Sequence, residues 1–346
     1  MLVHRVVAGA LMAALLAFAQ SPTVVLADAK ADTCSGHGTP QAVVAACTAL
    51  IETGGGSASN LAGIYIDRAN AYDTLGRHAR AIQDYDRAIA LEPNLPAAYY
   101  NRGMAYEALE ERDRALADFT HAIALRADDW EALGLRGYLY ESMGAYGKAL
   151  SDFNTATSVA GDKAVLLTGR ALAYEGLQSY GPAIDDFTSA IRLQPSPLAY
   201  SGRGHVEFFT GRYLRAARDF AQIVAQAPTY AYAVIWEDLS FARAGRSDPR
   251  FAHNVAALNP KAWPAPVVKL FLGTATPQDV EAAATSGDAT SLQGQRCEAA
   301  FYVGEWYVLH GQTNAARDRF ARAKSVCPHT FSEYFGALAE LGRDAP

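Results

Sequence analysis

The sequence predicts an all-α solenoid built from antiparallel helix pairs. The chain repeats itself roughly every 34 residues, small and aromatic residues recur in each row at helical spacing, and Gly or Pro marks the ends of the helices. Half of the 346 residues are hydrophobic and 19% are charged, so a long core can form and disorder is not the default.

An export signal is expected at residues 1–29. A short basic start precedes an uncharged apolar stretch from Val6 to Ala19, which is shorter than the about 20 residues that span a bilayer. Small residues suited to signal peptidase predict cleavage after Ala27 or Ala29. The first cysteine, Cys34, lacks a lipid-attachment motif before it, and no later segment approaches membrane-spanning length. We therefore expect an exported chain without a membrane span, located in the periplasm.

Residues 30–61 are expected to form an N-terminal cap. The stretch from Pro40 to Thr53 has the pattern of an amphipathic helix, and Gly54-Gly55-Gly56-Ser57 forms a flexible joint after it. A repeat array needs its open end covered, so this helix is expected to cover the first repeat.

Five rows between residues 62 and 230 share the same columns. One column holds a small residue, a second an aromatic residue in the first four rows, a third an alanine and a fourth another aromatic residue. These columns are, in order, Ala69, Gly103, Gly137, Ala171 and Gly204; Tyr72, Tyr106, Tyr140 and Tyr174; Ala81, Ala115, Ala149, Ala183 and Ala216; and Tyr85, Phe119, Phe153, Phe187 and Phe220.

The spacing of these columns explains how each row folds. Each set falls on one face of a helix, so the small residues let two helices approach and the aromatic rings fill the surrounding space. Gly76, Gly144 and Gly211 mark the turn between the helices, whereas the second and fourth rows have Glu110 and Gln178 there. The row length and the columns resemble tetratricopeptide repeats, which implies a right-handed superhelical solenoid.

The C-terminal third departs from the regular pattern. Residues 231–260 are expected to form a degenerate repeat, and residues 261–296 a helical insert with one helix from Pro266 to Leu272 and another starting at Thr276. The repeat returns at residues 297–330, and residues 331–346 read as a capping helix and tail.

The four cysteines predict two disulfides, because exported chains rarely keep free thiols. Cys297 and Cys327 occupy the two ends of an antiparallel helix pair, which lie side by side, so we expect them to pair. Cys34 and Cys47 would then tie the N-terminal segment to its own helix. A redox or metal site using Cys34 and His37 is the alternative, but no second ligand cluster or Cys-x-x-Cys motif accompanies it.

A ladder of opposite charges runs through the five rows. Arg recurs at position 7, and Asp follows sixteen residues later in every row. An anion-binding surface is one interpretation, but position 7 flanks the core stripe, so we expect partly buried bidentate ion pairs that fix helix register. The predicted pairs are Arg68 with Asp84, Arg102 with Asp118, Arg136 with Asp152, Arg170 with Asp186, and Arg203 with Asp219.

Tetratricopeptide proteins bind partners in a concave groove formed by positions 2, 5, 9 and 12 of the first helices. In this chain those positions combine a row of carboxylates with apolar and aromatic residues, which suits a protein segment bearing Lys or Arg and apolar anchors. A merely solvated helix face is the alternative. The predicted groove residues are Asp73, Tyr100, Met104, Glu107, Tyr138, Glu141, Leu172, Glu175, His205 and Phe208.

Other function classes are not supported by the sequence. A net charge of −6 argues against a nucleic-acid partner. The Gly54 segment lacks the Gly-Lys-Ser/Thr of a phosphate loop, the histidines are scattered, and no nucleophile elbow occurs. We expect no catalytic residue, no metal and no cofactor, and hence a binding protein rather than an enzyme.

The last third resembles the NlpI-type bacterial envelope lipoproteins, without their lipobox. The resemblance rests on Trp236-Glu237-Asp238-Leu239, Trp263, Phe271-Leu272-Gly273, Glu298, Phe301-Tyr302-Val303-Gly304-Glu305, Phe331-Ser332-Glu333-Tyr334 and Ala337-Leu338-Ala339-Glu340-Leu341. It implies an envelope adaptor that docks a C-terminal-processing protease and cell-wall hydrolases. A non-catalytic accessory subunit of an envelope hydrolase or polysaccharide complex is the alternative, and association into a homodimer is left open.

Overall fold

The computed structural model describes residues 33–54, 56–285 and 288–343, and over these residues it is helical with no strand. The all-α fold is therefore confirmed, while the expected export signal and its cleavage site lie outside the described residues. The chain divides into two compact units. Unit 1 runs to Tyr140 and includes Ser151–Gly161, and unit 2 comprises Glu141–Leu150 and the chain from Asp162 onward.

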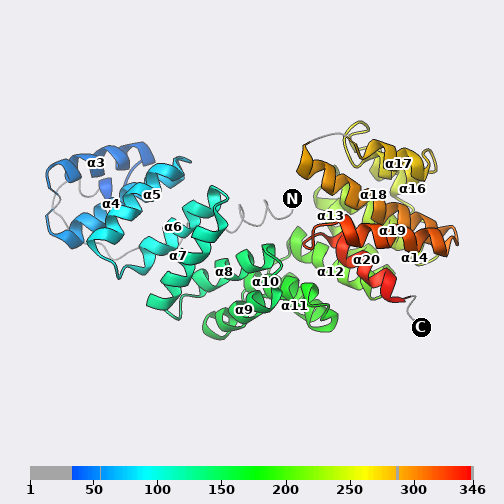
Figure 1. The fold of residues 1–346 in the computed structure, drawn as a ribbon, viewed down its shortest axis with the longest axis horizontal. Coiled ribbons are helices and arrows are strands. Elements are labelled where there is room, and N and C mark those ends of the chain that lie inside the picture. The colour runs from blue at the N-terminus through cyan, green and yellow to red at the C-terminus, as the bar shows by residue number, and fades with distance from the viewer. Residues whose placement is uncertain (1–32, 55, 286–287, 344–346) are drawn as a thin grey trace. The chain divides into compact units, whose positions relative to one another are not determined.

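Five successive helix pairs follow one N-terminal helix (Figure 1). The N-terminal helix α3 spans Pro40–Glu52 and packs on α4. The pairs are α4 (Ala58–Thr74) with α5 (His78–Leu91), α6 (Pro96–Ala108) with α7 (Arg112–Leu125), α8 (Trp130–Ser142) with α9 (Tyr146–Ala160), α10 (Ala164–Gly176) with α11 (Tyr180–Leu193), and α12 (Pro197–Phe209) with α13 (Tyr213–Gln226).

The contact between the two helices of a pair depends on the small residue of the first column. A Cβ atom added to Gly103 would lie 2.9 Å from a ring carbon of Phe119, and one added to Gly204 would lie 2.9 Å from Phe220. The alanine and aromatic columns of the second helices are buried throughout the five pairs. The helices therefore approach as closely as their backbones and one aromatic ring allow.

The turn inside each pair requires a left-handed backbone conformation. Gly76, Gly144 and Gly211 have φ angles of 68°, 72° and 77°. Glu110 and Gln178, which replace glycine in the second and fourth pairs, adopt the same conformation with φ angles of 62° and 56°. The turn geometry is thus kept even where the side chain makes it unfavourable.

Shorter helices follow the fifth pair. The degenerate repeat supplies α14 (Ala231–Arg243) and the brief α15 (Phe251–Val255), and the insert supplies α16 (Ala265–Phe271) and α17 (Pro277–Ala283). Thr276 and Asp279 form a capping box at the start of α17, as the sequence indicated. These helices are followed by α18 (Ala289–Leu309), α19 (Thr313–Val326) and α20 (Ser332–Arg343).

Helix α18 begins well before the repeat register places it. The register starts at Cys297, but Asp288 caps the helix by accepting a hydrogen bond from the Ser291 amide at 2.8 Å. The cap lets the helix include residues 289–296, the end of the predicted insert. Helix α18 is therefore longer than the first helices of the regular pairs.

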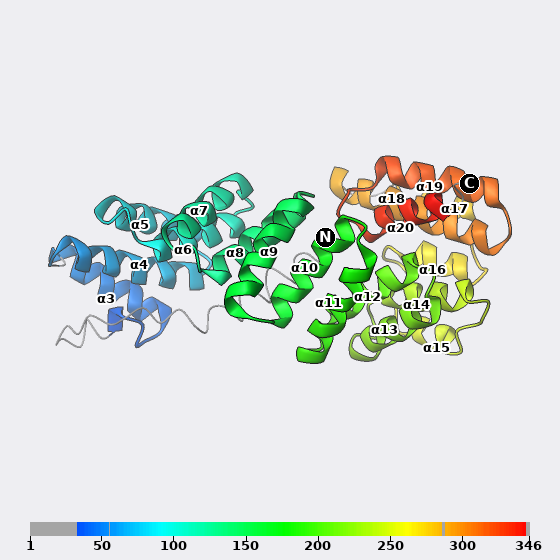
Figure 2. The ribbon, with the colours of Figure 1, turned by 90° about the horizontal axis from the view of Figure 1, so that it is seen from below.

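The last helix, α20, packs on α18, α19 and the much earlier α12 (Figures 1 and 2). Arg343 donates hydrogen bonds to the carbonyl oxygens of Phe208 and Phe209 at 3.0 and 2.7 Å. A Cβ atom on Gly336 would collide with Phe301 and press on Phe209. Helix α20 thus does more than cap the final pair, because it also covers the first helix of the fifth pair.

The strained turn residue Gln178 gives a test of the fold. Because a non-glycine residue with positive φ costs about 1 to 2 kcal/mol, Gln178→Gly should raise the free energy of unfolding by about 1 kcal/mol after the extra chain entropy of glycine is deducted. The reciprocal change Gly211→Gln should lower it by a similar amount. Chemical denaturation of both variants measures this, and a destabilised Gln178→Gly variant would contradict it.

Candidate functional site

Each of the five Arg–Asp pairs forms in the structure as a bidentate ion pair. The guanidinium Nε and Nη2 atoms donate to the two carboxylate oxygens at 2.6 to 2.8 Å in every pair. Nη1 of Arg68 donates to Thr48, and Nη1 of Arg102 donates to Asp86. The hydrogen bond from Arg102 to Asp118 raises the pKa of Arg102 above its usual value. These guanidinium groups are engaged within the fold, so the ladder is structural and not an anion-binding surface.

Replacing one arginine of the ladder should lower the free energy of unfolding. Arg102→Met leaves the Asp118 carboxylate, whose side chain is only 7% exposed, without its partner. Unfolding free energy should fall by about 3 kcal/mol, and adding Asp118→Leu should restore much of the loss. Arg114→Met is the control, because its pair with Glu111 is exposed and should contribute less than about 1 kcal/mol. Equal losses in the two single variants would refute the structural role.

All four cysteines are paired as the sequence predicted. Cys34 bonds to Cys47 and Cys297 bonds to Cys327, with Cα atoms 4.9 and 4.6 Å apart. Both bridges are buried. No thiol is left to serve a redox or metal site with His37.

In unit 1, the predicted groove residues Tyr100, Met104 and Glu107 lie half-buried on the first helix of the second pair. Burial raises the pKa of Glu107 above its usual value, and Arg112 opposes this only in part. No described residue forms a hydrogen bond or ion pair with the Glu107 carboxylate. Glu107 is thus a poorly hydrated acid that forms no ion pair with any described residue.

A further carboxylate, Glu131, belongs to this surface and was missed by the sequence reasoning. It occupies position 2 of the third row, so the rule for groove positions could have found it. Burial raises the pKa of Glu131, and the hydroxyl of Tyr100 feels the charges of Asp129, Glu131 and Glu107, although burial remains the main cause of its own raised pKa. We call the surface formed by Tyr100, Met104, Glu107, Glu131 and Tyr138 the unit 1 inner face.

The two end members of the unit 1 set are held by neighbouring side chains. Asp73 accepts hydrogen bonds from the Tyr85 hydroxyl at 2.9 Å and pairs with His78 Nδ1 at 3.0 Å. The Tyr138 ring packs edge-on against Phe153, with ring centres 5.0 Å apart. Asp73 is therefore committed to the fold, whereas Tyr138 supplies a fixed aromatic wall.

In unit 2, two predicted groove residues pack against aromatic rings. Phe208 is fully buried and packs against Tyr213 and Trp236. The His205 ring lies against Phe220 and Trp236, its Nε2 atom is buried, and burial lowers its pKa to about 3. The expectation for Phe208 is therefore wrong, because α14 brings Trp236 against it, whereas His205 remains half-buried.

The remaining groove residues of unit 2 gather around a shielded carboxylate. Glu175 is 6% exposed, and burial together with the nearby charge of Glu141 raises its pKa to about 8. The Tyr146 ring lies against α10 beside it, since a Cβ atom on Gly176 would lie 2.3 Å from that ring. The Tyr180 hydroxyl is buried without a hydrogen-bond partner among the described residues. Leu172 packs on the apolar core of the fourth pair.

The raised pKa of Glu175 predicts a pH effect. In the unfolded chain its pKa should be near 4.5, so between about pH 4.5 and 8 the folded protein holds a proton that the unfolded chain has lost. Stability is highest below this window and falls as pH rises through it.

Glu175→Gln removes this proton linkage. Its stability relative to the natural protein should therefore increase by up to about 1.4 kcal/mol per pH unit between about pH 5 and 8. Denaturant titrations across this range measure the difference, with Asp185→Asn on the exposed side of α11 as the control. A pH-independent difference for Glu175→Gln would show that Glu175 titrates normally.

Several glutamates of the C-terminal third are buried and accept hydrogen bonds, although Oε1 of Glu305 has no partner among the described residues. Glu298 accepts hydrogen bonds from the Trp263 indole at 2.6 Å and from the Tyr232 hydroxyl at 2.9 Å. Glu333 accepts a hydrogen bond from the Tyr302 hydroxyl at 3.0 Å. Arg243 donates to Glu305 at 2.6 Å and to Glu340 at 3.1 and 3.2 Å. Four of the acidic residues that carry the resemblance, Glu298, Glu305, Glu333 and Glu340, therefore serve as interior hydrogen-bond acceptors.

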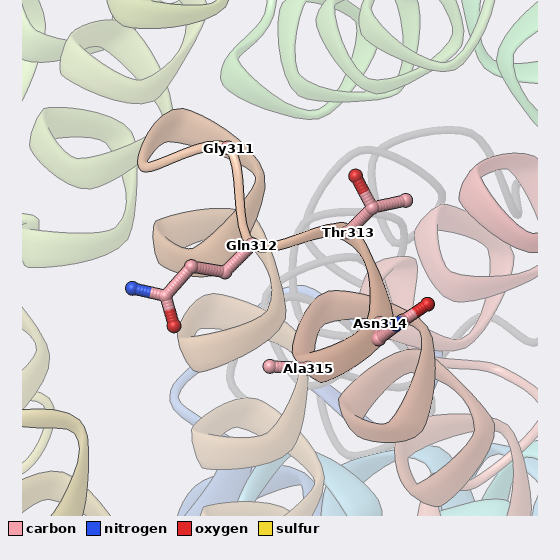
Figure 3. A pocket seen from close by; sticks show the side chains of 5 residues that line it. All are labelled: Gly311, Gln312, Thr313, Asn314 and Ala315. Atoms are coloured by element: carbon pink, nitrogen blue, oxygen red, sulfur yellow. The ribbon is translucent and has the colours of Figure 1, made fainter.

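Two hollows open on unit 2. One, of about 440 Å³, lies at the turn between α18 and α19. Figure 3 shows that the Gln312 side chain points away from those of Thr313 and Asn314, so no polar groups converge there. The other, of about 330 Å³, is lined mainly by apolar residues around Trp263.

The described residues contain no candidate metal site and no candidate membrane span. No cluster of three His, Cys, Asp or Glu side chains there could hold a metal ion. None of the described helices combines the length and apolar character needed to cross a membrane.

Family comparisons match the repeats of the first half. A TPR repeat model matches residues 69–110, and a tetratricopeptide repeat model matches residues 96–129 and 131–163. No match was found among curated proteins.

One similar solved structure shares the helical-repeat fold, and two others are similar over about half of the chain. A tetratricopeptide repeat protein from Parabacteroides merdae is 20% identical with a TM-score of 0.51, covering 77% of this chain and 93% of its own. MamA from Desulfovibrio magneticus is 21% identical with a TM-score of 0.45, covering 47% and 93%. YrrB, described as a TPR protein with an unusual peptide-binding site, is 18% identical with a TM-score of 0.47, covering 54% and 94%. The chain is thus a helical solenoid that contains tetratricopeptide repeats.

Proposed function

We propose that the protein is an envelope scaffold that binds a partner polypeptide on the unit 1 inner face through Lys or Arg side chains and apolar anchors. The observation that carries this proposal is Glu107, a half-buried carboxylate with a raised pKa and no partner among the described residues. Tetratricopeptide repeats are generally non-catalytic and bind proteins or peptides, which fits this use of the surface.

The chemistry of the unit 1 inner face favours a cation with an apolar stem. Glu107 and Glu131 lose hydration in the folded protein, so an ammonium or guanidinium group that reaches them recovers electrostatic stabilisation in a medium of low polarity. Tyr100 and Met104 offer apolar contact area for the aliphatic part of the same side chain. Glu175 presents similar chemistry within unit 2.

The disulfides support a location outside the cytoplasm. Two buried bridges close segments near the two ends of the described chain, and such bonds persist in oxidising compartments. Together with the expected export signal, they support our proposal of a periplasmic protein. The resemblance in the last third supports a C-terminal-processing protease or peptidoglycan hydrolases as the proteins that are docked.

Charge reversal on the unit 1 inner face tests the binding proposal. Glu107→Lys should weaken binding of an acetylated, amidated peptide of alternating Lys and Leu by at least about tenfold, because repulsion replaces attraction. Asp113→Lys is the matched control, since it makes the same charge change at an exposed position of α7. Fluorescence anisotropy measures the affinities, and the same peptide with Gln in place of Lys should bind weakly.

Crosslinking in an envelope extract identifies the partner class. Recovery of a protease or peptidoglycan hydrolase by the natural chain, and its loss with Glu107→Lys, would support the scaffold. Recovery of a polysaccharide synthase component would instead favour the accessory-subunit alternative. Equal peptide binding by Glu107→Lys and Asp113→Lys would exclude the unit 1 inner face as the binding surface.

A further inference from the structure

The apolar hollow of about 330 Å³ in unit 2 has the features of a small binding pocket. We call it the Trp263 pocket. Its walls come from the degenerate repeat and from the insert that follows it, where the chain departs from the regular repeat pattern. Leu258, Trp263, Val268 and Leu272 give it an apolar lining. Its volume lies at the lower end of the range for ligand sites, about 300 to 1,000 Å³, so it suits a short peptide end better than the face of a helix.

The wall formed by Trp263 is held in a fixed position. Its indole nitrogen donates a 2.6 Å hydrogen bond to Glu298, which also accepts from the Tyr232 hydroxyl at 2.9 Å. The polar edge of the indole is therefore used inside the protein, and the ring is left to offer apolar contact. Little ordering of this side chain would be needed when a ligand binds.

The polar groups around the pocket leave one cation available. Asn259 accepts a hydrogen bond from the Lys261 amide at 3.0 Å, and the Thr274 hydroxyl donates to the Lys269 carbonyl oxygen at 3.2 Å. Lys269 is the sole charged residue of the described lining, and no described residue pairs with its exposed ammonium group. None of the described residues that line the pocket is acidic, so none of them neutralises Lys269.

An apolar pocket with an unpaired ammonium at its edge fits one kind of ligand best. The last residue of a polypeptide joins an apolar side chain and a carboxylate at the same Cα atom, so the side chain can enter the pocket while the carboxylate reaches Lys269. Leu272, 39% exposed at the edge, can cover the outer side of that residue. We propose that the Trp263 pocket binds the free C-terminus of a partner polypeptide whose last residue is apolar.

Peptide binding with a matched pair of ligands tests this proposal. The probe is a fluorescein-labelled pentapeptide, Gly-Ser-Ala-Leu-Phe, made once with a free carboxylate and once as the C-terminal amide. The free acid should bind the full folded protein at least about tenfold more tightly than the amide, because only the acid can pair with Lys269. High salt should reduce that preference.

Variants at the edge of the pocket distinguish peptide binding there from peptide binding at other surfaces. In Lys269→Gln, the free-acid peptide should bind no more tightly than the amide. Leu272→Asp should abolish binding of the free-acid peptide, because the new carboxylate at the edge of the pocket repels the carboxylate of the peptide. Lys324→Gln, at an exposed position of α19, is the matched control and should bind as the natural protein does. Circular dichroism checks that each variant is folded. Glu107→Lys should leave this binding unchanged, which keeps the test independent of the unit 1 inner face.

Three outcomes would overturn the proposal. Equal binding of the acid and the amide would remove the role of the carboxylate, and an unaffected Lys269→Gln variant would remove the role of the cation. Absence of peptide binding by the folded protein would exclude the site, including the case in which decanoate binds and the pocket is a fatty-acid site.

Discussion

The close contact between a small residue on one helix and an aromatic ring on the next is the constraint on which the regular repeats depend. With Gly103 under Phe119 or Gly204 under Phe220, no space remains for a Cβ atom without displacing the ring. Because the two helices lie this close, position 7 of the first helix faces the Asp of the second. Arg102 can therefore donate two hydrogen bonds to the carboxylate of Asp118. The ion pair then sets the register that the ring contact alone would leave free. The half-buried acids of the unit 1 inner face lie on helices that these ring contacts and ion pairs hold in position.

The regular pairs could be predicted from the sequence because each depends on contacts within about one row. The columns that place Ala115 and Phe119 in the core are visible as periodicity, and the predicted disulfide of Cys297 with Cys327 follows from the same register. The length of α18 depends instead on one capping side chain, Asp288, outside any repeat. The packing of α20 on α12 brings together residues such as Arg343 and Phe208, far apart in the sequence, and no local pattern encodes such a contact.

The candidate site was predicted only in part for the same reason. Position within the first helix identifies which side chains face inward, and for Tyr100, Met104 and Glu107 this agrees with a half-buried surface. Position cannot tell what covers that face. Phe208 occupies the same position as Glu107, yet it is buried because Trp236 packs against it. Trp236 appeared in the sequence only as part of a family resemblance, and its ring neighbours Phe208, Phe220 and Phe301 lie on three different helices, α12, α13 and α18.

The buried and half-buried glutamates fall into two groups, those that accept hydrogen bonds within the fold and those that do not. Glu298 and Glu333 are well buried, yet each accepts hydrogen bonds from Trp or Tyr side chains, so their cost is offset within the fold. Glu107 and Glu175 have raised pKa values without such donors among the described residues. An unpaired charge in a poorly hydrated place is unfavourable. A carboxyl group without a donor or cation nearby is therefore stabilised either by taking up a proton or by binding a cation of another molecule. Where such an acid stands beside Tyr100 and Met104, a Lys or Arg side chain supplies both the missing charge and an apolar stem for the surface around it.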